Sequence, residues 1–160
     1  MAKRKLLNYL NKLSKEDLIK EVGKLYSKFK PVQEYYALEL GEDTTALLNE
    51  YKRKLNKLFL PKGSFLNPNL KEANNLVSQF SKISVFAFDK IDLMLYKVEL
   101  IKKFLEEWGH ESNSMVNSFI STYGKVVDLV HENDLEEYFR ERCERIEAYG
   151  MNYFLLNKTL

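Results

Sequence analysis

Apolar side chains recur every three or four residues along most of this chain, and this spacing constrains its fold more than any other feature. Residues spaced in this way lie on one face of an α-helix, whereas a half-buried β-strand alternates apolar and polar residues. We therefore predict an all-α protein in which each helix buries one apolar face. The clearest series are Leu18, Val22, Leu25 and Phe29; Leu48, Tyr51, Leu55 and Leu58; Leu70, Ala73, Val77 and Phe80; Ile91, Met94, Val98, Ile101, Leu105 and Trp108; and Val116, Phe119, Tyr123, Val126 and Val130.

Residues that start or end helices fall between these series. Three pairs have the spacing of a capping box, and Asp89 is placed to cap the long helix that follows Phe88. Three glycines follow apolar series and predict helix ends, because glycine adopts the left-handed terminal conformation at little cost. The pairs are Ser14 with Asp17, Asn69 with Glu72 and Asn133 with Glu136, and the glycines are Gly41, Gly109 and Gly150.

These signals predict about eight helices in a single domain, residues 1–160, with a candidate hinge at 61–69. Short connections favour antiparallel helical hairpins. Stretches 69–108 and 113–149 are each close to the length of a HEAT-type helix pair, so we expect a short curved HEAT-like array. A compact orthogonal helical bundle is the alternative. The expected helices span residues 3–13, 15–29, 32–40, 44–60, 69–83, 89–108, 113–131 and 134–149.

Composition places the protein in the cytoplasm. A chain of 160 residues buries enough surface to fold without a disulfide or metal, and its single cysteine has no internal partner. The N-terminus lacks the unbroken apolar stretch of about 7–15 residues that a secretory signal requires. No window approaches the roughly 18 consecutive apolar residues of a membrane span. We therefore expect a cytoplasmic protein with no membrane contact.

The charges are unevenly divided between the two parts of the chain. Residues 1–63 hold 14 Lys/Arg against 8 Asp/Glu, whereas residues 64–160 hold 11 against 15. Such an asymmetry can steer a partner toward the protein. Within the basic half, Arg53 and Lys57 project opposite the apolar series of their helix. This pattern is typical of a solvated helix face, and binding to a phosphate backbone is its alternative.

Tyr35 and Tyr36 are adjacent aromatic residues on a short helix with little charge. Neighbours on a helix point about 100° apart, so both rings cannot face the same point. Tyrosine often lies between two helices with its ring buried and its hydroxyl group in water. We therefore predict that the pair packs between helices, with an exposed recognition surface as the alternative.

Arg142 falls near the centre of the last apolar series, which runs through Leu135, Phe139, Ile146 and Tyr149. A guanidinium group there must pair with a carboxylate, extend to the edge of the helix, or bind an anionic ligand. The sequence leaves the ion pair and the ligand open.

Signals for metal binding or catalysis are weak. Glu107 with His110 and Asp128 with His131 have the three-residue spacing found in di-metal helical bundles. Both histidines stand at expected helix ends, where the helix dipole favours a cation. Cys143 has no histidine placed to act as its base, and no phosphate-binding glycine loop or paired-cysteine motif is present. We therefore expect no metal site, no cofactor and no catalytic residue.

Two stretches resemble a known family. The segment LNYLNKLSKEDLIKEVGKLYSKFKPVQEYY, together with DLMLYKVELIKKF and FRERCERI, is similar to an uncharacterised family of bacterial all-helical proteins, a domain of unknown function. The resemblance covers roughly residues 4–36 and 92–146. It implies a bacterial, cytosolic, helical protein, and it carries no activity or functional residue.

Together these observations predict a non-enzymatic protein-interaction or scaffold module whose partner is an unidentified protein or peptide. Packed helical hairpins offer a binding groove without any catalytic group. Nucleic-acid binding through the basic N-terminal half is the first alternative, and a helical-bundle metal protein is the second. The candidate interaction surface comprises Tyr35, Tyr36, Arg53, Lys57 and Arg142.

Overall fold

The structure, a computed structural model, describes residues 2–40, 44–60, 68–109 and 112–156. These residues form eight helices and no strand, which confirms the all-α prediction. None of the described helices is both long and apolar enough to cross a membrane. The helices are α1 (Ala2–Leu10), α2 (Lys15–Lys28), α3 (Lys30–Glu39), α4 (Thr44–Phe59), α5 (Leu70–Ile83), α6 (Ala87–Trp108), α7 (Asn113–Glu132) and α8 (Glu136–Leu156).

Several predicted helix ends are confirmed. Ser14 caps α2, because its Oγ accepts a hydrogen bond from the backbone N–H of Asp17 at 3.1 Å. Asn69 caps α5 in the same way, with the N–H of Glu72 at 3.1 Å from its Oδ1. Gly109 ends α6 in the left-handed conformation, with φ of 58°. Gly41 and most of the candidate hinge at 61–69 lie outside the described residues.

The predicted start of α6 is wrong. The helix begins at Ala87 after Phe86, and no side chain caps it. Asp89 is instead buried in the first turn, where burial raises the pKa of its carboxyl group. Packing stabilises the earlier start of the helix, because the ring centroids of Phe88 and of Phe139 on α8 lie 4.8 Å apart. Tertiary contact therefore outweighs the capping signal.

The predicted boundaries of α8 are also wrong. Asn133 ends α7 rather than starting α8, and its Nδ2 donates to the carbonyl of Leu129 at 2.7 Å. Asp134 then adopts a left-handed φ of 53°, which turns the chain into α8. At the other end, α8 continues through Gly150 to Leu156. Glycine costs only about 1 kcal/mol inside a helix, so one residue does not end a helix of this length.

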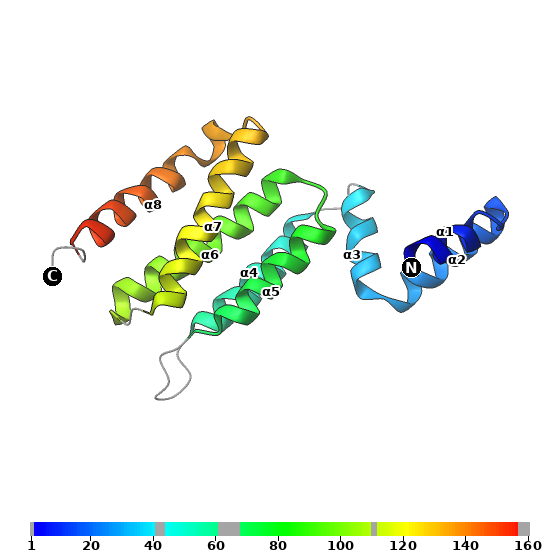
Figure 1. The fold of residues 1–160 in the computed structure, drawn as a ribbon, viewed down its shortest axis with the longest axis horizontal. Helices are drawn as coiled ribbons and strands as arrows, with labels where there is room; N and C mark the ends of the chain where they lie inside the picture. The colour runs from blue at the N-terminus through cyan, green and yellow to red at the C-terminus, as the bar shows by residue number, and fades with distance from the viewer. Residues whose placement is uncertain (1, 41–43, 61–67, 110–111, 157–160) are drawn as a thin grey trace.

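Helix α6 lies at the centre of the fold. It packs against α4 and α5 on one side and against α7 and α8 on the other. Helices α4 to α8 run beside one another with their connections at alternating ends, so neighbours in sequence are antiparallel (Figure 1). Helix α3 packs against α2, α4 and α5, and α1 and α2 project from the end of the molecule (Figure 1).

The hydrophobic core surrounds the middle of α6, where no residue from Ile91 to Ile101 is exposed. A helix enclosed in this way carries apolar residues around its whole circumference. Its polar residues must then be buried too, and each requires a partner. The side chains of α6 that lie in the core belong to Ile91, Leu93, Met94, Leu95, Val98, Leu100, Ile101, Phe104 and Leu105.

The difference between the core and the projecting helices can be measured with one substitution. Leu95 is fully buried, so Leu95→Ala should lower the free energy of unfolding by about 2–5 kcal/mol. Leu6 on α1 is exposed, so Leu6→Ala should change it by less than about 0.5 kcal/mol. Urea denaturation followed by circular dichroism measures both. Equal losses for the two variants would contradict this description of the core.

Candidate functional site

Helices α1 and α2 form an N-terminal arm, residues 2–28, whose apolar side chains lack a place in the core. Every residue of α2 is described, and none of its side chains is buried. The expectation that each helix buries its apolar face within the chain is therefore wrong for α2. The physical reason is position, because α2 packs against the short helix α3 and lies beyond the helices that enclose the core (Figure 1). The exposed apolar residues of the arm and its junction with α3 are Leu6, Leu7, Tyr9, Ile19, Val22, Leu25, Tyr26 and Phe29.

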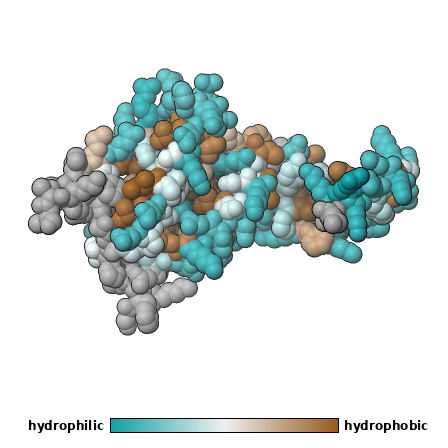
Figure 2. Space-filling view, in the orientation of Figure 1, coloured by the Kyte–Doolittle hydropathy of each residue, from teal (hydrophilic) through white to brown (hydrophobic). Residues whose placement is uncertain are grey.

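The arm is basic as well as apolar. It contains eight Lys/Arg residues and three Asp/Glu residues. Two of its lysines, Lys20 and Lys24, pair with acids one turn away on α2, in contacts that are exposed to solvent. Figure 2 shows hydrophilic side chains over much of the arm, at the right of the view, with hydrophobic side chains between them. A helix surface of this kind is amphipathic and carries a net positive charge.

The tyrosine pair lies at the joint between α2 and α3. The ring of Tyr36 is 6.4 Å from Tyr26 on α2 and 5.3 Å from Tyr35, so it packs between the two helices. Gln33 strengthens this joint, because its Nε2 donates to the carbonyl of Tyr26 at 2.8 Å. Tyr35 is exposed and borders the arm. Tyr36 therefore packs between helices, as we predicted for the pair, whereas Tyr35 is exposed, as the alternative required.

The basic face of α4 is largely paired with acids. Lys54 contacts Glu50 at 2.8 Å, and Lys52 contacts Asp92 on α6 at 2.7 Å. Arg53 and Lys57 are exposed on this helix. The convergent cationic surface that phosphate-backbone binding requires is thus reduced to these two residues on α4.

Arg142 joins three helices through carboxylates. Its Nε and Nη2 donate to the two oxygens of Glu99 at 2.7 and 3.0 Å, which is a bidentate pair. Its Nη1 donates to Asp92 at 2.6 Å, and the other oxygen of Asp92 contacts Lys52 at 2.7 Å. The Arg142 side chain is 23% exposed. The structure therefore shows the ion pair, one of the two readings that the sequence left open, and this ion pair ties α4, α6 and α8 together.

The histidine and cysteine candidates do not converge. His131 is exposed and its Nδ1 lies 3.0 Å from Glu136; the hydrogen bond to that carboxylate raises the pKa of His131. His110 lies outside the described residues. Burial raises the pKa of the Cys143 thiol, which keeps it protonated. Within the described part of the chain, no three His, Cys, Asp or Glu residues are grouped so that they could hold a metal ion.

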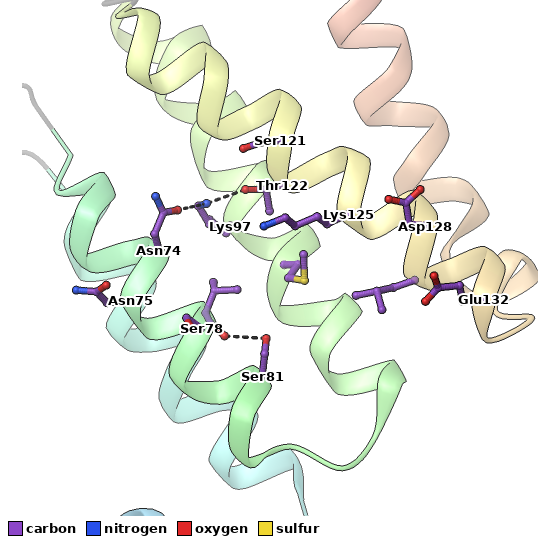
Figure 3. A pocket seen from close by; sticks show the side chains of 13 residues that line it. Asn74, Asn75, Ser78, Ser81, Lys97, Ser121, Thr122, Lys125, Asp128 and Glu132 are labelled. Atoms are coloured by element: carbon purple, nitrogen blue, oxygen red, sulfur yellow. Dashed lines mark hydrogen bonds between the residues drawn. The ribbon is translucent and has the colours of Figure 1, made fainter. Parts of the chain in front are cut away.

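A polar pocket between α5, α6 and α7 was not anticipated from the sequence. It is open to solvent and has a volume of about 740 Å³ (Figure 3). Lys97 of α6 lines it although its side chain is only 2% exposed. The Lys97 ammonium group donates to Asn74 Oδ1 on α5, and to Thr122 Oγ1 on α7 at 2.7 Å. Both acceptors are neutral.

Lys97 is an unusual buried cation. Burial lowers the pKa of Lys97, the nearby charge of Lys125 adds to this effect, and together they bring it to about 8. A sequence signal was present, because Lys97 stands at i+3 from Met94 and i−4 from Ile101 on one face of the helix. A charged residue at a core-facing position is the same signal that singled out Arg142.

The fold and these surfaces define an all-α protein with an enclosed central helix, a projecting basic arm and a polar pocket. The sequence model of a family of unknown function, DUF6155, matches residues 1–159. The chain therefore belongs to the DUF6155 family. No curated protein and no solved structure matches the chain. The HEAT-like character of the array thus stays a prediction.

The Arg142 network can be tested by removing its charge. Arg142→Met should lower the free energy of unfolding by about 2–3 kcal/mol, because Glu99 loses both of its charge-assisted hydrogen bonds in a half-buried position. Arg145→Met is the matched control, since Arg145 is exposed and, among the described residues, its polar contacts are with Glu141 of its own helix. This control should cost less than about 0.5 kcal/mol. Urea denaturation that finds Arg142→Met no more costly than Arg145→Met would contradict a structural role for the network.

Proposed function

We propose that this protein is a non-enzymatic interaction module that binds a partner protein through its N-terminal arm. The observation that carries the proposal is that α2 has an apolar series at helical spacing and buries none of it within the chain. A contiguous exposed apolar surface with polar residues at its edges is characteristic of an interaction site. The cytoplasmic location and the HEAT-like scaffold predicted from the sequence are part of this proposal.

The exposed parts of the apolar side chains of the arm can contribute favourable free energy to association. Val22, Leu25, Tyr26 and Phe29 succeed one another along one side of α2 and its end, and all are exposed. Each such side chain contributes about 1.5–3 kcal/mol when it is fully buried. Several together can offset the free energy that two proteins lose in translational and rotational freedom on association. A helix that lays residues of this spacing into a groove is a common mode of recognition.

The charge of the arm selects the chemistry of the partner. With eight basic and three acidic residues, two arms would repel each other, which disfavours pairing between arms of two copies. A nucleic acid would use the cations and leave the apolar series in water. An apolar groove with an acidic rim on another protein satisfies both features. Tyr35, Arg53 and Lys57 remain candidates for the edge of this surface, whereas Arg142 is held by Asp92 and Glu99.

Site-specific photo-crosslinking in the native host tests this proposal. A benzoylphenylalanine in place of Tyr26 should crosslink to one reproducible partner protein, because Tyr26 lies on the exposed face of the arm. The same residue in place of Tyr138 is the matched control, since Tyr138 is a still more exposed tyrosine on α8. Combining the Tyr26 crosslinker with Val22→Ser and Leu25→Ser should reduce the yield at least about tenfold, because these changes remove apolar contact and keep the charge.

Four outcomes would contradict binding of a different protein through the apolar series of the arm. Equal crosslinking from Tyr26 and Tyr138 would show no preference for the arm. Crosslinks only to a second copy of this chain would identify self-association, and crosslinks only to nucleic acid or lipid would identify those partners instead. The yield remaining unchanged after Val22→Ser and Leu25→Ser would show that the apolar series is not used.

A further inference from the structure

The pocket that Lys97 lines has the dimensions of a ligand site and a polarised lining. Its volume of about 740 Å³ lies within the usual range for small-molecule sites. Lys97 and Lys125 stand at one end, and Asp128 and Glu132 lie further along α7 (Figure 3). Apolar side chains of Val77, Met94 and Leu129 also contribute to the lining. The pocket therefore has a cationic end, an acidic end and apolar surface available to a ligand.

Lys97 is a buried cation in this pocket without an acidic partner among the described residues. An ammonium group has three donors, and Lys97 uses two of them on the neutral oxygens of Asn74 and Thr122. Among the described residues, no carboxylate pairs with it, and the nearest influential charge is the cation of Lys125. A buried charge without a counter-ion is costly, so proteins normally pair such groups. An anion in the pocket would supply the missing charge.

The partners of Lys97 are also suited to an anion. The Thr122 hydroxyl group accepts from Lys97, so its own proton remains to be donated. Asn74 accepts through Oδ1, which leaves the two N–H donors of Nδ2. Ser121 lines the pocket next to Thr122, and the Lys125 side chain points toward Lys97 (Figure 3). Cationic and neutral donors therefore come from three different helices.

We propose that this pocket binds a small molecule through one oxyanion group, a phosphate or a carboxylate, which Lys97 and Lys125 hold. The acidic residues Asp128 and Glu132 at the other end limit the site to a small ligand, because they would repel the next phosphates of a nucleic-acid chain. This site is separate from the N-terminal arm, so the test of anion binding is independent of the test of the proposed protein partner.

Nuclear magnetic resonance of the full chain tests the site with two probes, inorganic phosphate and acetate. Either probe should shift the backbone amides of Ser121 and Thr122 saturably. The side-chain resonance of Lys97 should titrate near its lowered pKa of about 8 in the free protein. Bound anion stabilises the charged ammonium group, so the titration midpoint should move upward. If phosphate produces these shifts and acetate does not, the site is assigned to phosphate esters. If both probes produce them, the site is assigned to oxyanions in general.

Substitutions separate a built site from general attraction to a basic surface. Lys97→Met and Lys125→Gln should each weaken anion binding at least about tenfold, the effect of losing one charge-assisted hydrogen bond. Lys125 is exposed, so Lys125→Gln keeps the test valid if Lys97→Met does not fold. Lys103→Gln on the exposed side of α6 is the control and should bind as tightly as the unmodified protein.

Two results would overturn the proposal. The first is that neither phosphate nor acetate shifts the pocket amides saturably or moves the Lys97 titration. The second is that Lys125→Gln weakens binding no more than Lys103→Gln does, which would make the effect one of overall charge.

Discussion

Helices α4, α5, α7 and α8 enclose the middle of α6, and this packing decides where the buried charges and the N-terminal arm lie. Between Ile91 and Ile101 no residue of α6 is exposed, so this stretch has no solvent-facing side for charged residues. The charged residues of this stretch must therefore find partners on neighbouring helices, and they do so in two groups. Asp92 and Glu99 bind Lys52 and Arg142, whereas Lys97 binds Asn74 and Thr122.

These two groups differ in their balance of charge. The first is balanced, because two carboxylates face two cations and join α4, α6 and α8. The second is unbalanced, since the ammonium group of Lys97 meets only neutral oxygens and has another lysine nearby. A buried group whose charges are balanced needs no additional counter-ion. A buried cation without a counter-ion, beside an open pocket, is where an anionic ligand would supply the missing charge.

The exposure of the N-terminal arm is explained by the same packing around α6. Once α4, α5, α7 and α8 enclose α6, the arm has no remaining core to join, and α3 is its contact with the folded body. Its apolar residues are left in solvent, and helices of nine and fourteen residues have little stability by themselves. The chain thus combines a packed helical body with an arm whose apolar face is exposed.

Local signals in the sequence predicted well where helices lie along the chain, but predicted poorly which of their faces are covered by other helices. Ser14, Asn69 and Gly109 act where they were expected, because a cap depends on a few neighbouring residues. Periodicity reports which face is apolar but not what covers it, so it assigned α2 a buried face that it lacks. The same reasoning treated α6 as one-sided and therefore missed Lys97. Arg142 was found because it interrupts an otherwise apolar series.

Hydrogen exchange of the backbone amides in the purified protein measures whether the enclosed helix α6 and the exposed arm differ in stability. We expect amides in the middle of α6 to open only with the highest free energies in the molecule, whereas those of α1 and α2 open with free energies at least about 3 kcal/mol lower. Protection of the arm equal to that of α6, at a concentration where the protein is monomeric, would contradict this expectation. Such a result would mean that the arm has a buried core of its own within a single chain.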